Sequence, residues 1–136
     1  VTVTTGARIT GLTPGTQYEV RVRAVSDAGL GTFSARVAAT TWAAPSAPQA
    51  LTAKVQGRNV QLSWIAPRDA GHSPVTDYVV EVSADGTTWT VVDDGVSAEP
   101  GARITGLAGK TSHLVRVAAV SDVGVGAWLT VSATTR

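Results

Sequence analysis

Hydrophobic and polar residues alternate along much of the chain. Val60, Leu62 and Trp64 are separated by polar residues, and the stretch from Tyr78 to Val82 has the same period of two. This spacing places apolar side chains on one face of a β-strand. The pattern predicts strands that begin near Leu51 and cover residues 60–64, 78–82, 87–92, 102–107, 113–119 and 128–134.

Helical patterns are missing from the sequence. No stretch has apolar residues at the spacing of three, four and seven that marks an amphipathic helix. About seven short strands separated by turn residues predict an all-β chain that folds as an antiparallel β-sandwich. Asp85-Gly86 precedes the stretch 87–92, and this dipeptide favours a tight hairpin with residues 87–92 as the returning strand.

The chain contains a long internal repeat. Residues 7–12, Ala-Arg-Ile-Thr-Gly-Leu, recur as residues 102–107, an offset of 102 − 7 = 95. Without a gap, 18 of the 35 residue pairs from 7/102 to 41/136 are identical. A repeated unit therefore ends at Thr41 and again at Arg136. The first 41 residues correspond only to the last part of the period formed by residues 42–136.

Two prolines mark the junction between the repeats. Pro45 and Pro48 lie within four residues in a stretch rich in alanine, which favours an extended, polyproline-II-like connector. We therefore expect a partial domain over residues 1–41, a Pro-rich linker over residues 42–48 and a complete domain over residues 49–136.

Composition narrows the class of protein. Hydrophobic residues make up 43 % of the chain, charged residues only 15 %, and the formal net charge is +1. Binding of nucleic acid requires clustered basic residues, and charge-driven disorder requires a high net charge, so both are excluded. No apolar run reaches the roughly 18 residues of a transmembrane helix. Because the chain has no cysteine, it forms no disulfide and offers no thiolate ligand.

Several short motifs follow one another in a fixed order. Residues 45–48, Pro-Ser-Ala-Pro, precede Leu51, and residues 60–64, Val-Gln-Leu-Ser-Trp, precede residues 78–82, Tyr-Val-Val-Glu-Val. Residues 12–18, Leu-Thr-Pro-Gly-Thr-Gln-Tyr, precede Val-Arg-Val. In this order the motifs resemble the fibronectin type III family in its bacterial tandem form. The resemblance covers the whole chain and implies an immunoglobulin-like sandwich.

The resemblance assigns structural roles to four residues. Trp64 and Tyr78 would be core aromatics on adjacent motifs. Tyr18 would be the corner tyrosine, whose hydroxyl bonds back to the upstream backbone. His113 takes the corresponding position in the complete domain, where an imidazole can still donate one hydrogen bond.

The resemblance also implies that residues 1–41 supply only the last strands of a sandwich, roughly strands E to G. Three explanations stay open for this segment. It is one piece of a longer array, it is completed by strands from another copy or fragment, or it is disordered or folded differently.

Candidate catalytic chemistry is sparse. His72 lies close to Asp69 and Ser73, but the three residues share one loop and lack the supporting shell that a catalytic triad needs. Asp93-Asp94-Gly95 offers two carboxylates, whereas calcium takes six to eight oxygen ligands. We therefore expect no enzyme activity, no catalytic or metal-binding residues and no cofactor.

Interaction residues are expected in the loops and among the tryptophans. The candidate loop residues are Arg68, Asp69, His72, Asp122 and Val123, in loops that lack an Arg-Gly-Asp tripeptide. The candidate exposed aromatics are Trp42, Trp89 and Trp128. A row of exposed rings would stack on sugars, whereas covered rings would close sandwich edges or a seam between units.

The preferred interpretation is a non-catalytic spacer and protein-interaction module from a tandem fibronectin type III array, secreted or at the cell surface. Its partners would be other domains of the same polypeptide or another protein chain, without nucleic acid or membrane insertion. One alternative is a carbohydrate-binding accessory domain of a secreted polysaccharide-degrading enzyme. Another is a structural subunit that self-associates through the incomplete first segment into a filament or phage-type particle.

Overall fold

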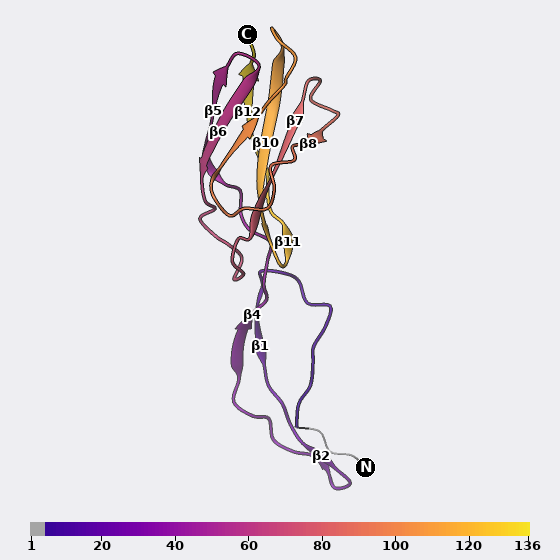
Figure 1. Cartoon of the computed structure of the whole chain (residues 1–136). Coiled ribbons are helices and arrows are strands. Elements are labelled where there is room, and N and C mark those ends of the chain that lie inside the picture. Colours follow the sequence, from indigo (N-terminus) through magenta and orange to yellow (C-terminus); the bar gives the residue numbers. More distant parts are fainter. Residues whose placement is uncertain (1–4) are drawn as a thin grey trace. The chain divides into compact units, whose positions relative to one another are not determined.

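A computed structural model describes residues 5–136, which contain twelve β-strands and no helix (Figure 1). The prediction of an all-β chain is confirmed. The chain divides into a first unit, Val1–Trp42, and a second unit, Ala43–Arg136. Among the residues that are described, no helix is long and apolar enough to cross a membrane.

The second unit is a two-layered antiparallel sandwich. One sheet has the order β5-β6-β9, and the other has the order β11-β10-β7-β8 with β12 paired to β10. The strands are β5 (Gln49–Gln56), β6 (Asn59–Ile65), β7 (Asp77–Ser83), β8 (Thr90–Val91), β9 (Gly101–Ile104), β10 (Ser112–Ser121), β11 (Gly124–Val125) and β12 (Leu129–Thr134).

The core of the second unit lies between its two sheets. Val60, Leu62 and Trp64 of β6 are buried, and the residues between them along the strand are exposed. Alternate residues of β10 pack against them, with Val115 and Val117 fully buried. The period of two seen in the sequence therefore marks the inward faces of both sheets.

The turn after β7 differs from the tight hairpin that we predicted. β8 covers only Thr90–Val91, because the Oδ1 atom of Asp85 accepts hydrogen bonds from the amides of Thr87 and Thr88, at 2.8 and 2.7 Å. Those two amides therefore belong to a loop held by Asp85 and do not join the strand ladder. The prediction of a returning strand over residues 87–92 was too long.

The first unit contains β1 (Gln17–Val20), β2 (Val25–Ser26), β3 (Gly29–Leu30) and β4 (Val37–Thr40). β1 pairs with β4, and β2 pairs with β3. The same pairings occur in the second unit, where β10 takes the place of β1 and β2, β11 that of β3, and β12 that of β4. Residues 6–9, the counterparts of β9, form no strand.

The ungapped alignment of the two repeats is wrong by one residue at the last strand of the first unit. Thr41 Oγ1 donates to the Thr13 carbonyl and accepts from the Thr16 amide, and Thr135 makes the same two bonds to residues 108 and 111. Thr41 therefore corresponds to Thr135, an offset of 135 − 41 = 94. The first unit therefore has one residue more than the second unit before its last strand. The ladder is irregular near Ser34, whose amide donates to the Val22 carbonyl and whose hydroxyl accepts from the Val22 amide.

Residues 43–48, which form most of the linker that we expected over residues 42–48, pack onto the second unit. The Ala43 amide donates to the Gly71 carbonyl, the Ser46 amide donates to the Asp69 carbonyl, and the Pro45 carbonyl accepts from the Ala127 amide. Pro45 and Pro48 are buried.

Two glycines permit the close approach of this connector. A Cβ atom on Gly71 would lie 1.9 Å from the Ala43 carbonyl oxygen, and one on Gly126 would lie 2.2 Å from that of Pro45. The backbone of residues 43–48 therefore occupies the space that a side chain at either position would need.

Candidate functional site

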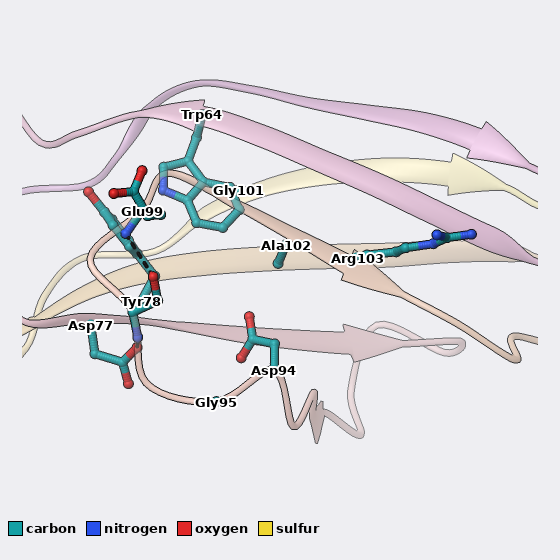
Figure 2. Close-up of a pocket in the computed structure, with 10 residues that line it drawn as sticks. Trp64, Asp77, Tyr78, Asp94, Gly95, Glu99, Gly101, Ala102 and Arg103 are labelled. Atoms are coloured by element: carbon teal, nitrogen blue, oxygen red, sulfur yellow. Dashed lines mark hydrogen bonds between the residues drawn. The ribbon is translucent and has the colours of Figure 1, made fainter.

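A pocket of the second unit lies where β6, β7 and β9 meet residues 94–99 (Figure 2). Its volume is about 290 Å³. Trp64 and Tyr78 form its aromatic wall, with their rings 5.1 Å apart in an edge-to-face arrangement. Three carboxylates line the pocket, those of Asp77, Asp94 and Glu99.

Trp64 contributes an unsatisfied donor to this pocket. Its side chain is almost fully buried, and its Nε1 atom has no hydrogen-bond partner among the described residues. Figure 2 shows the nitrogen on the edge of the indole that is turned toward Glu99 and Tyr78. The Tyr78 hydroxyl is the acceptor that faces this donor, because burial raises the pKa of Tyr78 and the Trp64 side chain lowers it by hydrogen bonding.

The electrostatics of the pocket are negative. Burial raises the pKa of Asp94 above its usual value, and the charges of Asp77 and Asp93 raise it further. Asp77 is held in place because its Oδ1 accepts from the Ser97 amide at 2.9 Å. Arg103 extends along β9 away from the three carboxylates (Figure 2). The arrangement therefore favours a basic group over an anion.

Trp89 and Trp128 are half-buried and share one cationic neighbour. The guanidinium carbon of Arg116 lies 4.1 Å from the centroid of the Trp89 ring and 4.3 Å from that of Trp128. The same guanidinium bonds to the Glu81 carboxylate at 2.6 and 2.5 Å. These tryptophans therefore belong to a cation–π cluster on the sheet surface, and an exposed row of rings is not what the structure shows.

A related cluster occupies the same place in the first unit. Arg21 is the counterpart of Arg116, and its guanidinium carbon lies 3.7 Å from the centroid of Phe33, the counterpart of Trp128. Arg23 lies 4.4 Å from the same ring. Glu81 has no counterpart among the described residues of the first unit, because the strand that would carry it is not there.

The predicted loop residues gather at one end of the second unit, where residues 43–48 meet it (Figure 1). Arg68, Asp69, His72, Asp122 and Val123 are all exposed. Asp69 Oδ1 accepts from the Gly71 amide at 2.8 Å, and His72 has a left-handed φ of 70°. No hydrogen bond among the described residues joins His72 to Asp69 or Ser73.

The corner residues have opposite hydrogen-bonding roles in the two units, since Tyr18 accepts and His113 donates. In the first unit the Tyr18 hydroxyl accepts from the Thr13 amide at 3.0 Å. Hydrogen bonding with Thr13, through its side chain and then through its backbone, lowers the pKa of Tyr18. In the second unit the His113 imidazole Nε2 lies 3.3 Å from the Ala108 carbonyl oxygen, to which the tautomer with hydrogen on Nε2 donates. The remaining predicted aromatic, Trp42, is 58 % exposed.

Sequence reasoning missed the acidic pocket and the role of Arg116. Asp93-Asp94-Gly95 was considered only as a weak calcium motif. Glu99 lies four residues after this motif and was not connected with it, and Asp77 precedes Asp93 by 16 residues. Arg116 lies opposite Glu81 in the β10–β7 register, a pairing that only the sheet topology reveals. Within residues 5–136 no three His, Cys, Asp or Glu side chains are grouped so that they could hold a metal ion.

Comparison with known sequences gives one consistent family. The sequence profile of the fibronectin type III domain matches residues 1–40 and 46–135. Mouse protein sidekick-2 is 37 % identical over 84 residues, which cover 61 % of this chain and 4 % of sidekick-2. Human myomesin-2 is 31 % identical over 125 residues, which cover 87 % of this chain and 8 % of myomesin-2. The chain thus spans less than a tenth of the length of these relatives, which are animal proteins and do not support the bacterial qualifier.

Solved structures show the same fold. Domains A168–A170 of titin match with a TM-score of 0.63 and 26 % identity, over 76 % of this chain and 36 % of the titin chain. Domains d3–d4 of the rat CD45 extracellular region match with a TM-score of 0.62 and 16 % identity, over 97 % of this chain and 70 % of that one.

Proposed function

Because the chain belongs to the fibronectin type III family, we propose that it is a non-catalytic spacer and protein-interaction module within a larger tandem array. The observation that carries this proposal is the tandem match itself, with the family profile found over residues 1–40 and again over residues 46–135. In this proposal the first unit is the C-terminal part of one domain, and the second unit is a complete domain.

The docked connector supports the spacer role. Three backbone hydrogen bonds and two buried prolines hold residues 43–48 on the second unit. A connector that is bound in this way has fewer free torsions than a flexible linker of the same length.

Two surfaces of the second unit support the interaction role. The loop residues described above are exposed at the end where the connector docks, and the acidic pocket favours a basic group from a partner protein. The partner would be another domain of the same polypeptide or a separate protein chain. Location at the cell surface or in the secreted fraction is part of the proposal and is supported by the family resemblance alone.

A carbohydrate-binding role has weaker support. It required Trp89 and Trp128 to form an exposed row of rings, whereas both rings are half-buried and stack on Arg116. The strand-complementation alternative concerns a different surface, on the first unit.

Force spectroscopy on the whole chain tests the spacer role. With handles at both ends, we expect one cooperative unfolding event for the second unit, lengthening the chain by about 300 Å for its 94 residues, at 3.3–3.6 Å each less the folded length. The Gly126→Ala variant should unfold at lower force, because it disturbs the docked connector. Extension without a discrete unfolding event would contradict the spacer role.

A further inference from the structure

The chain contains two Asp-Gly dipeptides, Asp85-Gly86 and Asp94-Gly95, and both lie in the second unit. In an Asp-Gly pair the backbone amide of the glycine can attack the preceding side-chain carboxyl group with little hindrance, because glycine has no Cβ atom. All four residues are exposed. Exposure therefore does not distinguish the two dipeptides, and a difference in their reactivity has to come from the bonds that hold them.

Asp85-Gly86 is held at both of its reacting groups. The Gly86 amide donates to Ser83 Oγ at 2.8 Å, which engages the nitrogen that would have to attack. Asp85 Oδ1 accepts from the Ser83 hydroxyl at 3.0 Å and from the amides of Thr87 and Thr88. These bonds, above all the one from the Thr88 amide, lower the pKa of Asp85. The carboxyl group is therefore kept as the ionised carboxylate, which is a poor electrophile.

Asp94-Gly95 lacks these restraints. Its loop is fixed on either side, where the Val92 amide donates to a β7 carbonyl at 2.9 Å and the Ser97 amide donates to Asp77 Oδ1 at 2.9 Å. Between these two bonds, the Gly95 amide makes no hydrogen bond within the described part of the chain, and the Asp94 carboxyl bonds only to the amide of its own residue. Both reacting groups are therefore available.

The surroundings of Gly95 leave room for the reaction. Gly95 has a left-handed φ of 81°, and a Cβ atom added to it would meet no heavy atom within 4 Å. At Gly86 the same added atom would lie 3.4 Å from Leu114 Cδ1. Burial raises the pKa of Asp94, which favours the neutral carboxyl group. A neutral carboxyl group loses its hydroxyl more readily than a carboxylate loses an oxide, so the chemistry also favours this position.

We propose that Asp94-Gly95 is a site of spontaneous covalent modification, at which Asp94 converts to isoaspartate while Asp85-Gly86 is protected. The Gly95 nitrogen forms a bond to Cγ of Asp94, and its proton leaves with the carboxyl hydroxyl as one water molecule. A five-membered succinimide ring results. One water molecule then opens the ring. Cleavage of the bond between nitrogen and Cγ restores aspartate, whereas cleavage of the bond between nitrogen and the backbone carbonyl carbon gives isoaspartate.

The product changes the acidic pocket described above. In isoaspartate the main chain runs through Cγ, so it is one carbon atom longer at this position, and the free carboxylate is attached to Cα. Asp94 lines the pocket together with Asp77 and Glu99. The modification therefore moves one of the three carboxylates. This inference goes beyond the spacer and interaction role and does not depend on it.

Ageing of the whole folded chain, in neutral buffer below its unfolding temperature, is the direct test. Trypsin releases residues 69–103 as one peptide, because no lysine or arginine lies between Arg68 and Arg103. Electron-transfer fragmentation then distinguishes isoaspartate from aspartate at both positions of the same peptide. We expect isoaspartate to form at position 94 at least about tenfold faster than at position 85, where several hydrogen bonds have to open first. Equal rates, or aspartate alone at position 94, would overturn the proposal.

The chain unfolded in guanidinium chloride is the control for local sequence. Unfolding removes the bonds that protect Asp85-Gly86, so the rates at the two positions should come within about threefold of each other. If position 85 stays as slow as in the folded chain, its neighbours in sequence protect it, and the structural assignment is wrong.

Ser83→Ala tests the protection within the folded chain. It removes the hydroxyl that bonds to the Gly86 amide and to Asp85, and should raise the rate at position 85 at least about threefold without changing the rate at position 94. The amide signals of β7 and β10 report whether the variant keeps its fold. An unchanged rate at position 85 in the folded variant would contradict the assigned protection.

Two substitutions at position 94 test the ring itself. Asp94→Glu keeps the carboxylate but would have to close a six-membered ring, which forms more slowly, so modification at this position should disappear while position 85 is unaffected. Asp94→Asn closes the same five-membered ring with loss of ammonia, and should give both aspartate and isoaspartate faster than the natural chain. Absence of isoaspartate in aged Asp94→Asn would show that the folded loop does not let the ring close, and the proposal would be wrong.

Discussion

The two units of this chain have closely similar sequences over their shared strands but very different burial. Val22 and Val117 are the same residue at the same place in the repeat, yet one is 70 % exposed and the other is fully buried. In the second unit β6 packs over the inner face and β7 pairs with the edge. Burial in a sandwich is therefore a property of the opposing sheet, and a strand's own alternation only offers the face to be covered.

Local interactions, by contrast, are the same in both units. The threonine near the end of the last strand bonds to the same turn, and the arginine of the central strand stacks on an aromatic ring. These contacts join residues that lie close together within strands and turns common to both units. They need no second sheet, so they form wherever the sequence recurs.

Truncation of the shared isoleucine should give the largest difference between the units. Ile104→Ala leaves a cavity in the core and should cost about 3 kcal/mol of unfolding free energy in the second unit. Urea denaturation followed by the fluorescence of buried Trp64 measures this cost. Ile9→Ala removes an exposed side chain and should change the exchange rates of the β1 amides by an amount equivalent to less than about 0.5 kcal/mol. Similar costs at both positions would show that the first unit buries this face.

The two equivalent glycines should respond differently to alanine. In Gly126→Ala the new Cβ meets the Pro45 carbonyl oxygen at 2.2 Å, so the connector must move, at a cost of about 1–3 kcal/mol. In Gly31→Ala the nearest atom, the Ala24 carbonyl oxygen, is 3.2 Å away, and the cost should be below about 1 kcal/mol. Thermal denaturation measures the first cost, amide exchange the second. A neutral Gly126→Ala would mean that residues 43–48 are not docked in solution.

Lysine substitution separates the complete cation–π cluster from the partial one. Arg116→Lys keeps the charge but loses the planar guanidinium that stacks on two tryptophans and bonds to Glu81. The substitution should lower the free energy of unfolding by about 1 kcal/mol. Arg21→Lys should cost less than about 0.5 kcal/mol, because it has one ring and no carboxylate partner. Chemical denaturation of Arg116→Lys and amide exchange in Arg21→Lys give the comparison. Equal effects of the two substitutions would mean that Trp89 and Glu81 contribute nothing to the stability of the cluster.

The smallest expected effect concerns pH. Hydrogen bonds from the amides of Thr88 and Thr87, with one from the Ser83 hydroxyl, hold the pKa of Asp85 well below its usual value. A lowered pKa stabilises the folded state above the unfolded value of about 4, and this stabilisation is lost as the pH falls further. Asp85→Asn should therefore be less stable than the natural chain at pH 7, and the gap should narrow below pH 4.

Urea denaturation of both forms at pH 7, 4 and 2 measures this gap. The first unit has no counterpart of this loop among its described residues, so its amide exchange should show no difference between the two forms. A gap that stays constant across the pH series would contradict the assigned hydrogen bonds.

Alternation and turn residues were enough to predict the all-β sandwich and the inward faces of β6 and β10, and the resemblance of several ordered motifs indicated the family. These features depend on residues that are neighbours in sequence, because a period of two is a property of a single strand. The tertiary structure alone decided which residues meet across strands. It joined Arg116 to Glu81 and two tryptophans, brought Asp77, Asp94 and Glu99 to one pocket, and shifted the last strand of the first unit by one residue. Contacts of this kind depend on sheet register and loop path, which a single sequence does not encode at any fixed spacing.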